Sequence, residues 1–179
     1  TAVGAVGVKS VAAYRTGFRL DPAPPEGDPF TQIGSDGGLL ERPQGLSAVT
    51  IAPGERYDVV VDFGRYPVGT EVTLRNELGR GSTEDVMRFV VARRAADDTR
   101  VPARLREVER YERSAAAGVR RFRFRRGTVD RHAGWMVNDR PFDPVRPVAR
   151  IPAGQLEVWR VTTDLHHPVH VHLGAFQVL

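Results

Sequence analysis

Residues 165–179 read Leu165-His166-His167-Pro168-Val169-His170-Val171-His172-Leu173-Gly174-Ala175-Phe176-Gln177-Val178-Leu179, and they hold four of the five histidines of the chain. His170 and His172 alternate with valine and leucine in this stretch. Alternate side chains of a β-strand lie on the same face. The pattern therefore predicts a strand that presents both imidazoles on one face and apolar side chains on the other. His167 is out of phase with this pair, so we expect it to serve a different site.

The histidine cluster predicts a metal site. Imidazole is the most frequent metal-binding side chain near neutral pH, and it suits Zn, Cu, Ni and Fe. The plainer interpretations are exposed strand residues or a purification tag, but a proline and the alternating valines interrupt the run and argue against a tag. The other histidines are interpreted without a ligand role: His132 as a solvated residue of a charged turn, and His166 as an exposed loop residue.

The composition is that of a globular protein, with 41% hydrophobic and 27% charged residues among 179. This length suffices for one ordinary domain or two small ones. The 26 basic and 22 acidic residues give a formal net charge of +4. No cysteine is present, so disulfides are excluded and no thiolate is available for a blue-copper site. No stretch approaches the roughly 18 apolar residues of a membrane span, so no membrane partner is expected.

Most of the chain reads as short β-strands separated by turns. Residues 57–63 are β-branched and aromatic, and residues 70–75 alternate with Val72 and Leu74 expected to point inward. Residues 34–38 supply glycines for a tight turn. Short strands without intervening helices favour a sandwich or a barrel. Further strands are expected at 30–33, 46–51, 86–91, 119–126, 135–138 and 156–161.

Residues 92–114 differ from the rest because they are dense in Arg, Asp and Glu. Apolar residues at Leu105, Val108 and Tyr111 predict a helical turn or two within a linker between two β units. A basic helix that binds a partner is the alternative, but the alternation of charge sign along 104–113 favours a solvated face.

Residues 119–126 alternate apolar and basic side chains. As a strand, this segment is expected to turn Phe122 and Phe124 to a core and its arginines to water. A nucleic-acid surface would need arginines and stacking aromatics on the same face. Here they oppose each other, so we predict no nucleic-acid partner.

The histidine stretch and several upstream segments together resemble multicopper oxidases, with the bacterial spore-coat laccase and bilirubin oxidase group most similar. Residues 167–173 are similar to the first histidine motif of that family's last cupredoxin domain. Residues 135–143 and 154–161 resemble the opening strands of the same domain, whereas 32–40 and 52–63 resemble the middle domain. The resemblance covers residues 18–179, and the motifs occur in the family's order.

This resemblance implies an all-β fold of tandem cupredoxin-like Greek-key β-sandwich units, the second incomplete. Residues 1–92 would form the middle domain, with 1–17 poorly matched, and 93–118 a charged linker. Residues 119–179 would form the N-terminal half of the last domain. We expect that half-domain to be less stable than residues 30–92, because part of its core and some strand edges would be uncovered.

The resemblance also implies a copper-dependent oxidoreductase that oxidises phenolic or similar small-molecule donors and reduces dioxygen to water. Carried over by motif, His167 would bind type 1 copper, His170 type 2 copper and His172 type 3 copper. The family's first domain and the His-Cys-His stretch of the last domain have no counterpart in these residues. No catalytic set is therefore complete, and the chain alone is expected to be inactive without the N- and C-terminal parts of a longer parent.

Two other functions stay open at this point. One is a non-catalytic β-sandwich module that binds Zn or Cu through His170, His172 and a third ligand; a cupin-like version is disfavoured because no glutamate follows His172 as that motif requires. The other is an arginine-rich β domain that acts as a binding surface, with incidental histidines. Nothing in the sequence indicates a cellular location.

Overall fold

The computed structural model describes residues 3–9, 16–164, 168–172, 174 and 176–179. Contacts divide the chain into two compact units, Thr1–Val108 with His170–Leu179, and Glu109–Val169. The predicted all-β class is confirmed, since the described residues form strands and three single-turn 3-10 helices, η1 (Phe63–Arg65), η2 (Gly81–Thr83) and η3 (Arg113–Ala115). Among these described elements, no helix has the length and apolar character needed to cross a membrane.

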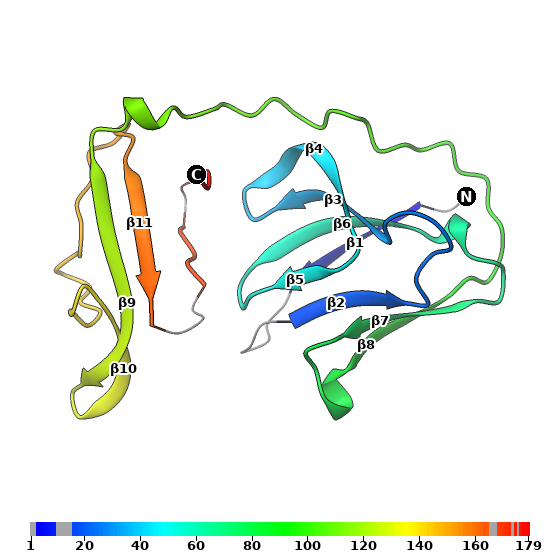
Figure 1. Cartoon of the computed structure of the whole chain (residues 1–179), viewed down its shortest axis with the longest axis horizontal. Coiled ribbons are helices and arrows are strands. Elements are labelled where there is room, and N and C mark those ends of the chain that lie inside the picture. The colour runs from blue at the N-terminus through cyan, green and yellow to red at the C-terminus, as the bar shows by residue number, and fades with distance from the viewer. Residues whose placement is uncertain (1–2, 10–15, 165–167, 173, 175) are drawn as a thin grey trace. The chain divides into compact units, whose positions relative to one another are not determined.

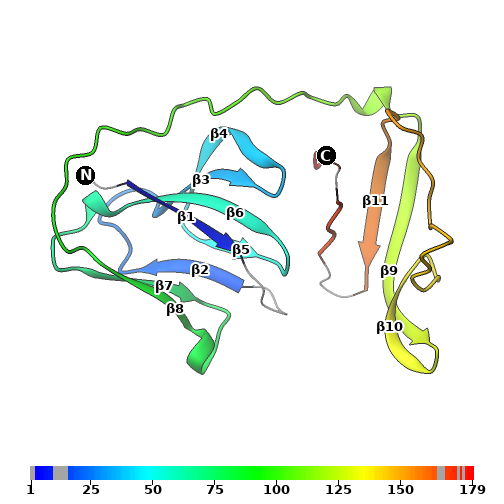
Figure 2. The ribbon, with the colours of Figure 1, turned by 180° about the vertical axis from the view of Figure 1, so that it is seen from behind.

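The first unit contains two four-stranded antiparallel sheets (Figures 1 and 2). One sheet has the order β1-β6-β3-β4 and the other β5-β2-β7-β8. The strands of the first sheet are β1 (Val3–Lys9), β6 (Arg56–Asp62), β3 (Phe30–Ser35) and β4 (Gly38–Leu46). Those of the second are β5 (Val49–Ile51), β2 (Thr16–Asp21), β7 (Glu71–Asn76) and β8 (Asp85–Val90).

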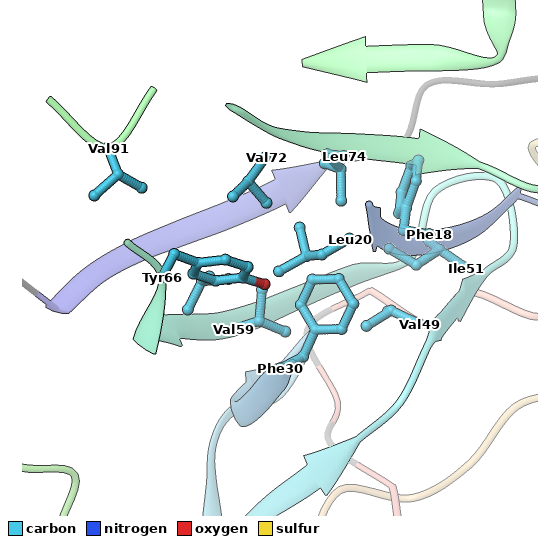
Figure 3. Packing of buried hydrophobic residues seen from close by; sticks show 11 residues of the cluster. Phe18, Leu20, Phe30, Val49, Ile51, Val59, Tyr66, Val72, Leu74 and Val91 are labelled. Atoms are coloured by element: carbon cyan, nitrogen blue, oxygen red, sulfur yellow. The ribbon is translucent and has the colours of Figure 1, made fainter. Parts of the chain in front are cut away.

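Apolar side chains from both sheets meet in one core (Figure 3). Strand β7 alternates as predicted, because Val72 is 0% and Leu74 4% exposed, whereas Thr73 between them is half-buried and Glu71 is exposed. This period of two is what a strand with one face on a core requires. The sandwich predicted from the strand pattern is therefore present in this unit. Its other buried members are Phe18, Leu20, Phe30, Val49, Ile51, Val59, Val61, Tyr66 and Val91.

A buried amide, Asn76, closes the turn that follows β7. Its Oδ1 accepts hydrogen bonds from the backbone N–H groups of Gly17 (3.2 Å) and Leu78 (3.1 Å), and its Nδ2 donates to the carbonyl of Thr83 (3.3 Å). A Cβ at Gly79 would lie 2.3 Å from the same carbonyl oxygen. One side chain thus ties β2 to both ends of the β7–β8 connection.

The edge of β4 explains two differences from the sequence-based expectations. Strand β4 has no counterpart among the strands expected from the sequence. It contains Pro43, but it lies at the edge of its sheet, where a missing N–H is tolerated. No helical turn forms at Leu105 or Val108, since residues 92–112 contain no helix; the helical turn within the expected linker is η3 (Arg113–Ala115). Instead, the Leu105 N–H donates to the Glu41 carbonyl at 2.8 Å. The backbone groups at the edge of a sheet offer such acceptors, so the Leu105 N–H finds its partner in β4.

The second unit is a three-stranded sheet in the order β10-β9-β11 (Figure 1). Its strands are β10 (His132–Val137), β9 (Val119–Val129) and β11 (Val158–Thr163). β10 is antiparallel and β11 parallel to β9. Phe122 and Phe124 are half-buried on one face of β9, and Arg121 and Arg123 are exposed on the other, as predicted. No described residue of this unit is fully buried. The lower stability expected for residues 119–179 stays a prediction.

Candidate functional site

The rings of His170 and His172 lie together. Their centroids are 4.6 Å apart and their planes meet at 88°, edge to face. Both residues are exposed, whereas Val169 and Val171 are half-buried. The alternation expected for this stretch is thus present, with the two imidazoles directed away from the partly covered valines.

The strand expected to carry this pair is not formed by the described residues 168–172. A strand requires a ladder of backbone hydrogen bonds with a neighbour, and no pairing in the described part of the chain includes this segment. The exposed histidines and half-buried valines therefore alternate although the described residues 168–172 form no β-ladder.

The remaining histidines do not extend the pair within the described structure. His167, expected at type 1 copper, and His166 both lie outside the described residues. His132 begins β10, is exposed, and has its Nδ1 2.7 Å from the Asp130 carbonyl oxygen. No group of three or more His, Cys, Asp or Glu side chains with metal-site geometry occurs among the described residues. The described donor set is therefore two imidazoles.

This two-imidazole pair fits copper as part of a ligand set. Imidazole nitrogens suit Cu as well as Zn, Ni and Fe. Because both rings are exposed, an ion reaches them without opening a core. Two nitrogens leave further coordination positions for donors from elsewhere.

Strand β11 leads towards the histidine stretch, and Glu157 anchors its start. The Glu157 side chain is only 6% exposed. It accepts hydrogen bonds from Arg120 Nε (2.8 Å) and Nη2 (2.6 Å), from Trp159 Nε1 (3.1 Å) and from Gln155 Nε2 (3.2 Å). The hydrogen bonds from Arg120 are the main reason that the pKa of Glu157 lies below its ordinary value. Such bidentate charge-assisted pairs are among the stronger polar contacts in proteins.

A second acid, Asp164, follows the last residue of β11. Its Oδ2 accepts a hydrogen bond from the Arg126 backbone N–H at 3.1 Å, and its own N–H donates to the Phe124 carbonyl at 3.3 Å. Neither acid was identified from sequence. The available signal was their position, since each flanks the strand that precedes the histidines.

The arginines of β9 are largely engaged within the unit. Arg123 and Arg125 both pair with Asp139, and the hydrogen bond from Arg125 is the main reason that the pKa of Asp139 is lowered. The Arg126 guanidinium lies 5.5 Å from the centroid of the Trp135 ring, within range of a cation–π contact. These partners argue against an arginine surface held free for nucleic acid.

Comparison with known proteins gives related sequences, although a scan against models of protein families finds no match. The chain is 33% identical over 166 residues to a laccase of Bacillus subtilis (strain 168), a match that covers 86% of this chain and 32% of the laccase. It is 37% identical over 172 residues to a bilirubin oxidase of Albifimbria verrucaria, covering 84% of this chain and 28% of the relative. The chain thus spans about a third of the length of these curated relatives.

Solved structures give the same family. A laccase-like multi-copper oxidase from Ochrobactrum sp. matches with a TM-score of 0.71 at 26% identity, over 90% of this chain and 38% of that one. A multi-copper oxidase from Pediococcus acidilactici matches with a TM-score of 0.74 over 90% of this chain and 32% of that one, and at 23% identity it supports the fold alone. The chain matches part of the length of laccases and bilirubin oxidases. Together, the sequence and structural similarities show that it belongs to the multicopper oxidase family.

Proposed function

We propose that these residues serve a laccase-like copper-dependent oxidoreductase by supplying imidazole ligands to its copper sites. His170 and His172 are assigned to the type 2 and type 3 coppers, and His167 to the type 1 copper. When bound, copper supplies one-electron oxidation of a small donor molecule coupled to reduction of dioxygen to water. The contribution of the chain itself is to hold two imidazoles side by side and open to solvent.

The adjacent rings of His170 and His172 are the observation that carries this proposal. Two histidines separated by one residue present both imidazoles to one ion or to two neighbouring ions only if their side chains point the same way. Their rings meet edge to face, and the half-buried valines alternate with them. Surface histidines without a function would not be expected to have adjacent rings in a chain that is also similar in sequence to multicopper oxidases.

One of the similar structures supports the proposed substrate class. The structurally similar Ochrobactrum enzyme has oxidase activity towards lignin model compounds and lignosulfonate. This supports phenolic or similar donors as the substrates proposed here. Because a type 1 site requires a thiolate and the chain has no cysteine, we also propose that these 179 residues alone do not turn over. The thiolate and further imidazoles would come from sequence equivalent to the rest of the relatives.

Oxygen consumption with a phenolic dye tests the proposal, using the full-length gene product and its variants, because the 179 residues alone are proposed to be inactive. We expect copper-dependent activity that His170→Ala abolishes and that His132→Ala leaves unchanged, because the exposed His132 ring lies against the Asp130 carbonyl of its own turn. Copper content measured on the same samples separates lost metal from lost folding. Full activity in His170→Ala, or copper-independent oxidation in the parent, would refute the assignment.

A further inference from the structure

Two arginines lie directly side by side on one face of the second unit, the face opposite Phe122. In the parallel register of β9 and β11, Arg121 pairs with Arg160, and the two strands are neighbours in the sheet (Figure 1). Residues paired in this way lie on the same face, and neighbouring strands are about 4.8 Å apart. Both arginines are exposed. Two long cationic side chains therefore leave the sheet from adjacent positions.

This arginine pair has no counterion of its own. Within the described part of the chain, neither guanidinium has an ion-pair or hydrogen-bond partner. The acids that bind these strands are engaged elsewhere: Asp139 with the next two arginines of β9 on this face, Glu157 on the opposite face, and Asp164 with the β9 backbone. Like charges directly opposite each other on a sheet are destabilising. An arrangement that lowers stability and lacks an internal counterion points to an anion supplied from outside.

An apolar pair lies beside the arginines on the same face. Val119 of β9 pairs with Val158 of β11, two residues before the arginine pair, which is about 6.6 Å along the strands. Val119 is 49% exposed and Val158 is half-buried. On the other side of the arginines, exposed Thr162 adds a hydroxyl donor. The face therefore offers cationic donors next to accessible apolar surface.

We propose that Arg121 and Arg160 form a binding site for an organic phosphate. The two guanidinium groups would hold the phosphate, and Val119 and Val158 would contact the apolar body of the ligand. Guanidinium groups bind phosphate through paired N–H donors, and two of them match its double negative charge. The apolar pair favours a phosphate ester over the free ion. This site belongs to the second unit alone, and it depends neither on the histidines nor on the proposed copper chemistry.

The opposite face holds the two arginines in register. There, nearly buried Glu157 accepts two hydrogen bonds from Arg120, at 2.8 and 2.6 Å. This contact ties the start of β11 to β9 one residue before Arg121. Because the strands are already paired, binding a phosphate orders only the two arginine side chains.

Phenyl phosphate is the probe, added to the 179-residue chain, and inorganic phosphate is the comparison. The Nε–H signals of Arg121 and Arg160 in nuclear magnetic resonance spectra should both shift and saturate together. Calorimetric titration should show that Arg121→Gln and Arg160→Gln each lower the affinity about tenfold, because each removes one charge-assisted contact. Phenyl phosphate should bind more tightly than inorganic phosphate, since its ring covers the valine pair.

Reversing one charge separates binding from stability. Arg160→Glu places a carboxylate opposite Arg121, so it should abolish phosphate binding and raise the melting temperature of this unit by a few degrees. The fluorescence of Trp135 and Trp159 reports this melting, since both residues lie in strands of the same sheet. Arg150→Glu is the matched control. It changes the net charge equally at an exposed position outside the strands, and it should change neither the affinity nor the melting temperature.

Four results would overturn the proposal. Unchanged affinity in both glutamine variants, or an equal loss in Arg150→Glu, would show attraction to the basic chain in general. A lower melting temperature in Arg160→Glu would show that the paired arginines do not repel each other. Equal affinity for phenyl phosphate and inorganic phosphate would remove the apolar part of the site. Tighter binding of single-stranded DNA through the same arginines would make this face a nucleic-acid surface instead.

Discussion

Replacing Asn76 by alanine should destabilise the first unit strongly, because three backbone groups depend on one buried amide. The Gly17 N–H is buried, and leaving it without a partner costs about 1–3 kcal/mol. The Leu78 N–H and Thr83 carbonyl belong to exposed residues and can turn to water, so each loses about 0.5–1.5 kcal/mol. The expected loss in the free energy of unfolding is therefore about 4 kcal/mol.

A urea titration measures this loss when unfolding is monitored through the amide exchange of Val72 and Leu74, since both residues are buried in the core of the first unit. With a urea dependence of about 2 kcal/mol/M, the midpoint should fall by about 2 M. Trp135 and Trp159 are the two tryptophans of the chain and belong to the other unit, so tryptophan fluorescence should show an unchanged transition there.

Gln32→Ala is the matched control for Asn76→Ala. Its amide is half-buried and donates one hydrogen bond, to the Gly34 carbonyl at 3.1 Å, so its removal should cost about 1 kcal/mol. A loss below about 1 kcal/mol for Asn76→Ala would contradict the claim that this amide satisfies a buried N–H group.

Three other predictions follow from burial, close packing and charge. Phe30→Ala should cost about 3–5 kcal/mol in urea unfolding because Phe30 is 2% exposed, whereas Phe142→Ala, at a position 89% exposed, should change it by less than about 0.5 kcal/mol. Gly79→Ala should lower the melting temperature by several degrees, since the added Cβ would lie 2.3 Å from a carbonyl oxygen; an unchanged melting temperature would show that the turn relaxes freely. The pKa of Glu157 is lowered in the folded state, so its carboxylate stabilises the second unit at pH values above its ordinary pKa of 4.5. This stabilisation is lost as the pH falls through the lower folded pKa. Tryptophan fluorescence in acid titrations should show the loss of stability, and Arg120→Met should make stability depend less on pH in this range.

Strands whose side chains alternate between a core and solvent could be predicted from the sequence. Val72 and Leu74 were expected to point inward, and both are buried. Period-two alternation reports burial directly, so such strands can be read without a structure. Strand β4 could not be read in this way, because Pro43 and its glycines resemble a loop until the edge position of the strand is known.

Contacts distant in sequence account for the errors. The spacing of Leu105 and Val108 suggested a helix, but the Leu105 N–H bonds the Glu41 carbonyl, a partner that no local pattern reveals. Likewise, the alternation of His170 and His172 predicted adjacent imidazoles, and the rings are adjacent. The strand around them depends on a neighbouring strand, and the described residues provide none. The hydrogen bonds that join Glu157 and Asp164 to β9 likewise connect residues distant in sequence, which no local pattern reveals.

The most direct test of the claim that His170 and His172 are copper ligands is the electron paramagnetic resonance spectrum of the 179-residue chain with less than one equivalent of Cu(II). Under this condition a second ion is not available, so the adjacent rings are expected to share one ion rather than to serve the two neighbouring coppers of the proposed oxidase. The account predicts superhyperfine splitting from at least two imidazole nitrogens, with one fewer in His170→Ala and in His172→Ala, and no change in His132→Ala. A spectrum with the same nitrogen count in the unsubstituted chain and in both single variants would contradict the claim that these two histidines bind copper together.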